Sequence, residues 1–241
     1  MCFSATASFA SAGVMAGIGV VSVVHNKSHS HRMFAVVPLL FAIQQASEGI
    51  VWETINRPAH ARVFAMAVTA FLGFALVVWP TWLPMSLLRM EMNVTRRRII
   101  RGLVWVGVAA STVGAAVLVF WSPAAQIDEH SIRYDYPHIG NHAVQVGYFL
   151  LYLVPAVVPT FLSSLILARW IGGVLLVSLI STIIIKLDTL TSVWCFFATT
   201  LSCLIVLSTY RRQRSPMQRS SRPELSASPS GDDRDGGERV L

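Results

Sequence analysis

The chain has 241 residues, of which 54% are apolar and only 13% are charged, whereas a soluble domain carries roughly 25% charged residues. Together with a mean hydropathy of +0.59, this composition excludes a soluble globular protein. The net charge of +7 does not indicate nucleic-acid binding, because the arginines flank apolar segments or lie in a polar tail, as cytoplasmic membrane flanks do. We expect a multipass protein of the cell membrane, with the lipid bilayer as its partner and no nucleic acid.

Apolar runs of about 20 residues, the length that crosses a bilayer, predict an all-α fold of about seven transmembrane helices. In chain order these are 5–24, 33–54, 63–88, 99–121, 142–167, 170–186 and 190–209. Beyond residue 210 the chain is rich in Ser, Pro, Gly and charge, which predicts a disordered tail. The sequence therefore divides into a membrane domain, 1–210, and a basic cytoplasmic tail, 211–241.

A cysteine follows the initiator Met directly, at Cys2. Removal of that Met would leave an amine and a thiol on adjacent carbons, which together form a candidate metal ligand or nucleophile. A disulfide between Cys2 and Cys195 is an equal alternative in an oxidising compartment, and an inert packed thiol is another. The sequence leaves these readings open.

The second predicted helix carries the most informative polar stripe in the chain. Gln45, Glu48 and Trp52 share one face by their i, i+3 and i+7 spacing, and Gln44 lies one turn before Glu48. An ionisable residue inside a membrane span is costly unless it faces a partner or a cavity. Glu48 is therefore either polar packing between helices or the ionisable element of a site. It lies six residues before Thr54, about 9 Å below the outer helix end, within reach from outside.

Prolines interrupt two of the predicted helices. The third contains Pro80 and Pro84, and the fifth contains Pro155 and Pro159. A proline frees a backbone carbonyl, which inside a membrane needs a new partner or water in a cavity. We expect kinked or loosened turns at these positions, with packing in the core as the alternative to a cavity.

Two histidines, His138 and His142, are spaced i, i+4 at the start of the fifth helix, so both can face one zinc or copper ion. A metal site needs a third and a fourth ligand. The candidates on the same side are His130, Glu48, Asp188 and Cys2. Interface histidines without a metal are the alternative.

In the seventh predicted helix, Trp194 and Cys195 lie about one turn inside the outer end. Asp188 precedes this helix. Tryptophan suits this boundary, because its ring buries apolar area while its N–H reaches water or a carboxylate. We expect a polar pocket that opens outward between helices one, two and seven. Its candidate residues are Cys2, Gln45, Glu48, Trp52, Asp188, Trp194 and Cys195.

Lysines and arginines are distributed unequally between alternate connections, which predicts the orientation because basic flanks are retained in the cytoplasm. One side receives Lys27, Arg32, Arg89, Arg96, Arg97, Arg98, Arg101, Arg169, Arg211, Arg212 and Arg214. The other receives Arg57, Arg62, Arg133 and Lys186. The N-terminus is therefore expected outside and the C-terminus inside.

Three segments carry a family resemblance: the opening MCFSATASF, the stretch VVPLLFAIQQASEGIVW and the late SVWCFFATTLS. Together they resemble a family of uncharacterised multipass membrane proteins, mostly bacterial, that begin Met-Cys-Phe-Ser-Ala. The family pattern falls on Cys2, Phe3, Ser4, Pro38, Gln45, Glu48, Trp52, Trp194 and Cys195. The resemblance implies the membrane fold and names no activity.

Three functions remain compatible with the sequence. The first is a binding or sensing module, or a transporter of a small solute or proton, in which Glu48 is the ionisable element. The second is a membrane-embedded metal- or thiol-dependent enzyme acting on lipid or a periplasmic substrate through Cys2, His138, His142 and Asp188. The third is a structural or assembly subunit whose polar residues serve packing. The sequence leaves the oligomeric state and metal occupancy open.

Overall fold

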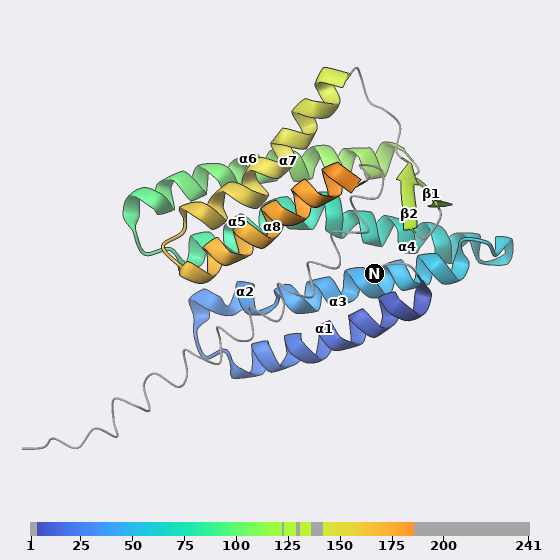
Figure 1. Ribbon diagram of the computed structural model, residues 1–241, viewed down its shortest axis with the longest axis horizontal. Helices are drawn as coiled ribbons and strands as arrows, with labels where there is room; N and C mark the ends of the chain where they lie inside the picture. Colours follow the sequence, from blue (N-terminus) through green and yellow to red (C-terminus); the bar gives the residue numbers. More distant parts are fainter. Residues whose placement is uncertain (1–3, 122, 129–130, 136–141, 186–241) are drawn as a thin grey trace, which may run out of the picture.

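The computed structural model describes residues 4–121, 123–128, 131–135 and 142–185. Most of them are helical, and the helices pack lengthwise into a bundle (Figure 1). The elements are α1 (Ala5–His25), α2 (Arg32–Ala35), α3 (Val37–Thr54), α4 (Ala61–Gly73), α5 (Trp79–Met90), α6 (Val94–Phe120), β1 (Ala124–Asp128), β2 (Ser131–Asp135), α7 (His142–Leu162) and α8 (Ile166–Ile185).

The first six predicted helices are confirmed as helical segments, with some ends displaced. The helix expected at 99–121 begins earlier, because the side chain of Asn93 accepts the Arg96 N–H at 3.1 Å and caps it. The break expected after residue 167 falls instead at residues 163–165, between α7 and α8. The seventh predicted helix, 190–209, and the tail, 211–241, lie outside the described residues.

Four helical stretches in the described part of the chain are long and apolar enough to cross a membrane. They are Ala5–His25, His29–Thr54, Pro58–Met90 and Val94–Phe120. Two shorter apolar stretches follow in α7 and α8, Val146–Leu162 and Ile166–Val177. The composition and helix lengths are thus consistent with a membrane protein.

The α1 helix packs along α3 through a face of small side chains. The buried positions of α1 recur every three to four residues, as one helix face requires. They are Ser8, Ala12, Met15, Gly19 and Ser22. Small residues on this face let the two backbones lie close together, as in membrane helix pairs.

The largest apolar cluster lies where α1, α2, α3, α5 and α8 meet. Its buried members are Met15, Phe34, Val37, Phe41, Ala42, Trp79, Leu83, Leu87, Met90, Ala168, Ile171 and Leu175. The cluster adjoins the polar stripe of α3, because Phe41 and Ala42 lie within one turn of Gln44 and Gln45 on the same helix.

The α4 and α5 helices join through a π-helical turn, Phe74–Val78, and Pro80 follows within the first turn of α5. Pro80 lacks the N–H that would continue the helical hydrogen-bond ladder. The Val77 carbonyl in the π turn accepts the Ser111 hydroxyl of α6 at 2.6 Å. The oxygen of that hydroxyl also lies 2.8 Å from Oγ1 of Thr81. A non-α turn therefore lies next to Pro80, as expected, whereas Pro84, Pro155 and Pro159 lie inside α5 and α7.

Two glycines allow α6 to approach this kinked segment. A Cβ atom at Gly107 would overlap the carbonyl oxygen of Pro80, and one at Gly114 would lie 2.7 Å from the carbonyl oxygen of Leu76. A backbone carbonyl cannot move aside as a flexible side chain can. Gly107 and Gly114 therefore set the spacing between α6 and the α4–α5 segment.

A β-hairpin follows α6, which is the one departure from the all-α prediction in the described residues. β1 and β2 pair antiparallel, with Ala125 opposite Tyr134 and Ile127 opposite Ile132. The Tyr134 ring stacks on Phe71 of α4, with centroids 4.8 Å apart. The hairpin therefore packs on α4 near the end of α3.

The connections alternate between the two ends of the bundle (Figure 1). Those between α1 and α2, α5 and α6, and α7 and α8 gather at one end, on the left in the figure. The α3–α4 connection and the hairpin lie at the other end. Two hydrogen bonds join elements at the end that holds the α1–α2, α5–α6 and α7–α8 connections. The Trp82 indole donates to the Met33 carbonyl at 3.1 Å, and the Ser164 N–H donates to Glu91. Successive long helices are therefore antiparallel.

Candidate functional site

The polar stripe predicted on the second helix lies on α3 and is buried. Glu48 is 0% exposed, Gln45 2% and Gln44 4%. These residues occupy a helical stretch that is long and apolar enough to cross a membrane. A carboxyl group and two amides thus form a polar centre inside an apolar bundle, and we call Gln44, Gln45, Glu48 and Trp79 the polar centre below.

Hydrogen bonds orient the side chains of the polar centre. The Gln45 amide donates to Oε2 of Glu48 at 3.2 Å, the pairing that the i, i+3 spacing predicts. The Trp79 indole donates to Oε1 of Gln44 at 2.8 Å across the bundle. Phe41 stacks on the Trp79 ring, with centroids 4.0 Å apart and planes at 24°. The stacked ring fixes the indole donor, which in turn holds the Gln44 amide.

Trp52 lies one turn beyond Glu48 toward the hairpin end of α3. Its ring is half-buried and packs against a second apolar cluster, which includes Val51, Phe71 and Tyr134. Within the part of the chain that the structure describes, its buried indole N–H has no hydrogen-bond acceptor. A buried indole normally has one, so this donor is available to a group outside those residues.

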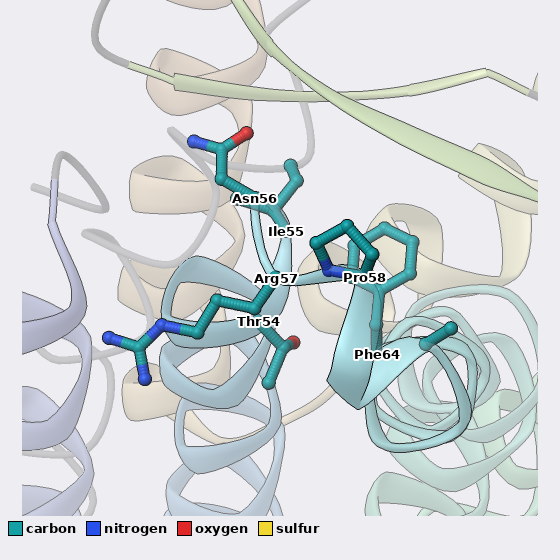
Figure 2. Close-up of a pocket in the computed structure, with 7 residues that line it drawn as sticks. Thr54, Ile55, Asn56, Arg57, Pro58 and Phe64 are labelled. Carbon is teal, nitrogen blue, oxygen red and sulfur yellow. The ribbon is translucent and has the colours of Figure 1, made fainter.

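A cavity of about 220 Å³ lies just past the end of α3. Its lining residues are Thr54, Ile55, Asn56, Arg57, Pro58, Ala61 and Phe64. Figure 2 shows the Arg57 guanidinium pointing away from Pro58 and Phe64; it lies 3.3 Å from Oε2 of Glu53. The cavity lies at the end of the bundle where we expected an outer opening, but it is formed between α3 and α4, and none of Gln45, Glu48 and Trp52 lines it.

Several candidate residues fall outside the described part of the chain. These are Cys2, His130, His138, Asp188, Trp194 and Cys195. His142 begins α7, but its side chain is likewise outside the description. Among the described residues, no three His, Cys, Asp or Glu side chains lie close enough together to hold a metal ion. The convergence of the two cysteines with Glu48 and the zinc or copper site both stay predictions.

A second buried carboxylate, Glu91, was missed by the sequence analysis. Glu91 ends α5 and is 2% exposed. It accepts the Ser164 N–H and hydroxyl, each at 2.7 Å, and the Asn93 N–H at 2.9 Å. The Arg96 guanidinium donates to the same Ser164 hydroxyl oxygen at 3.1 Å. Glu91 thus joins the α5–α6 connection to the α7–α8 connection.

These hydrogen bonds decide the ionisation of Glu91. Burial opposes the charged form and on its own would raise the pKa of this carboxyl group. The donors from Ser164, Asn93 and Ser163 outweigh burial and lower the pKa of Glu91 below its ordinary value. The only signal in the sequence was an acidic residue at the head of an arginine-rich connection, which is an ordinary surface pattern.

The fold and the polar centre together define a mostly helical protein. Its described residues include four helical stretches of membrane-spanning length, one of which buries an ionisable group. The chain belongs to a family of unknown function: the model described as Family of unknown function (DUF6629) matches residues 1–221. This match confirms the resemblance drawn from the MCFSATASF opening. No curated protein and no solved structure matches the chain.

Proposed function

We propose that the chain is an integral membrane protein of seven crossings, with its N-terminus outside and its C-terminus inside, in which Glu48 binds and releases a proton. In this proposal the polar centre belongs to a sensor or to a transporter of a small solute. The observation that carries it is the complete burial of Glu48 in an apolar helix, with Gln45 donating to its carboxyl group.

The chemistry of the polar centre supports proton exchange. Ionisable residues within membrane spans are costly and mark proton relays and substrate pathways. The neighbours that orient Glu48 and Gln44 are an amide and an indole, which hydrogen-bond a carboxyl group or a solute without contributing a charge. A change in the protonation of Glu48 would therefore change the charge of the whole centre.

The hairpin end of α3 is the proposed route of access. The cavity begins at Thr54, six residues from Glu48, which corresponds to about 9 Å along a helix. Trp52 lies between them, and its indole N–H has no acceptor within the described residues. In the proposal, Cys2, Asp188, Trp194 and Cys195 complete the outer side of this route.

The arrangement of the connections supports the orientation. The end of the bundle that holds the α1–α2, α5–α6 and α7–α8 connections (Figure 1) carries most of the basic residues of the described chain, including Lys27, Arg89 and Arg96. Basic flanks are retained in the cytoplasm. This end is therefore the proposed inner end, and the cavity faces outward.

Infrared difference spectroscopy of the lipid-reconstituted protein tests the role of Glu48. Between two pH values, a group that exchanges a proton gains or loses the C=O stretching band of a protonated carboxyl. We expect Glu48→Gln to remove one such band. The matched control is Glu53→Gln, five residues along the same helix, where the carboxylate is exposed and paired with Arg57. Spectra of the Glu48→Gln protein that keep every wild-type band would overturn the proposal.

A further inference from the structure

The outward face of α6 carries arginines and a tryptophan in one line. Arg98, Arg101 and Trp105 are spaced i, i+3 and i+7, so they share a helix face. The opposite face packs into the bundle through Ile100, Val104, Gly107, Ser111 and Gly114. All three side chains of the line are exposed, Trp105 by 69%.

The tryptophan marks the depth of this line in a membrane. α6 is long and apolar enough to cross a bilayer, and a tryptophan exposed on such a helix favours the level of the lipid headgroups. Arg101 lies one turn, about 6 Å, closer to the helix start than Trp105. Long arginine side chains near helix ends extend toward the interface, so both guanidinium groups reach the level of the lipid phosphates.

The two arginines lack a partner of opposite charge in the described chain. The described residues do include an ion pair, but it joins Arg57 to Glu53 at the other end of the bundle. Arg96, by contrast, is engaged by Ser164. Guanidinium groups bind phosphate oxygens in bidentate geometry, and side chains one helical turn apart are neighbours, with Cβ atoms about 5–6 Å apart.

We infer that Arg98, Arg101 and Trp105 bind the headgroup of an anionic phospholipid in the leaflet at the arginine-rich end of the bundle. The guanidinium groups hold the phosphate, and the Trp105 ring packs on the glycerol and upper acyl region. A zwitterionic lipid fits less well, because its own ammonium group competes for the phosphate charge. The inference rests on the proposed membrane orientation but not on proton exchange by Glu48.

Native mass spectrometry of the full chain in detergent, titrated with phosphatidylglycerol or phosphatidylcholine, tests the site. We expect Arg98→Gln combined with Arg101→Gln to weaken phosphatidylglycerol binding by roughly thirtyfold, since each of the two basic residues near an anionic surface contributes about fivefold. Phosphatidylcholine binding should not change. The matched control is Arg57→Gln combined with Arg62→Gln, which removes the same charge from the opposite end and should bind phosphatidylglycerol like the wild type.

Three outcomes would overturn the inference. The first is equal phosphatidylglycerol affinity in the Arg98/Arg101 variant and the wild type. The second is an equal loss in the Arg57/Arg62 control, which would mean that net charge alone controls binding. The third is displacement of the lipid by millimolar inorganic phosphate, which would indicate a site for free anions. None of these outcomes bears on the infrared band of Glu48, so the two proposals fail separately.

Discussion

The side chains of the polar centre are held by contacts that only partly lie within α3. The Gln45 amide that donates to it lies one turn away on α3, while Gln44 is fixed from α5 by the Trp79 indole. The first contact follows from the helical spacing that places both residues on one face. The second joins residues 35 positions apart and depends on how the π turn orients Trp79, which no spacing rule provides.

Substitutions at Glu48 should separate hydrogen bonding from apolar packing. We expect Glu48→Gln to leave the fold intact, because an amide still accepts from Gln45. Glu48→Leu removes that acceptor and should lower the free energy of unfolding by about 1–3 kcal/mol, the usual effect of leaving a buried donor unpaired. Thermal unfolding in one detergent compares the two variants. Equal tolerance of both would mean that the hydrogen bonds of Glu48 do not stabilise the protein.

At the scale of elements, Glu91 shows how one side chain joins two connections at the same end of the bundle. Three donors from Asn93 and Ser164 converge on its carboxylate. The Ser164 N–H is thereby directed out of α7, in keeping with the end of that helix at Leu162 rather than near residue 167. Apolar run length predicts where helices lie, but it cannot place an end that depends on a hydrogen bond to a residue 73 positions away.

The lowered pKa of Glu91 predicts a pH dependence of stability. Its folded pKa lies below the ordinary value of about 4.5, so near that pH the unfolded chain binds more protons than the folded one. The stabilisation is therefore full above about pH 4.5 and is lost as the pH falls through the folded pKa. We expect Glu91→Gln to lower the melting temperature at pH 7 and to flatten this acid-side decline.

Thermal unfolding at several pH values measures this effect. Glu53→Gln serves as the control, because its carboxylate is exposed and only ion-paired on the surface, where such pairs contribute little. A Glu91→Gln protein with the wild-type pH profile would show that the three hydrogen bonds do not stabilise the carboxylate.

Because α6 packs closely against the α4–α5 segment, enlarging a glycine at this contact should lower the stability of the protein. Gly107→Ala would drive a Cβ atom into the carbonyl of Pro80, and overpacking of this kind destabilises by about 1–3 kcal/mol. Gly102→Ala on the same helix meets nothing within 4 Å and should be neutral or slightly stabilising, as alanine favours helices. Chemical denaturation in mixed micelles compares them. A Gly107→Ala protein as stable as Gly102→Ala would contradict the close packing.

The hairpin and the π turn mark the limit of sequence-based prediction for this chain. Apolar run length identified every long helix now described, because membrane-length helices differ strongly in composition from their connections. A strand pair of five residues each leaves only a short alternation, with Ile132 and Tyr134 on one face. A π turn has no compositional signature of its own: Pro80 indicated a loosened turn nearby, but the backbone bond from the Trp79 N–H to the Phe74 carbonyl is seen only in the structure.

At the scale of the whole molecule, the antiparallel order of the helices places alternate connections at opposite ends (Figure 1). Assigning lysines and arginines to alternate sides requires successive helices to be antiparallel, and they are antiparallel in the described part of the bundle. The division at residue 210, the seventh helix and the orientation remain predictions. They share one consequence, namely that the chain after Thr54 and the chain after residue 210 lie on opposite sides of the membrane.

Fusions to alkaline phosphatase test whether these two parts of the chain lie on opposite sides of the membrane, because this enzyme is active only outside the cytoplasm. One strain carries the enzyme after Arg57 and another carries it after Arg214. The Arg57 fusion ends in the α3–α4 connection, and the Arg214 fusion ends past all seven predicted helices. The account predicts an active enzyme after Arg57 and an inactive one after Arg214, at equal protein levels. The reverse pattern would contradict the orientation, and inactivity at both positions would contradict a membrane-crossing chain.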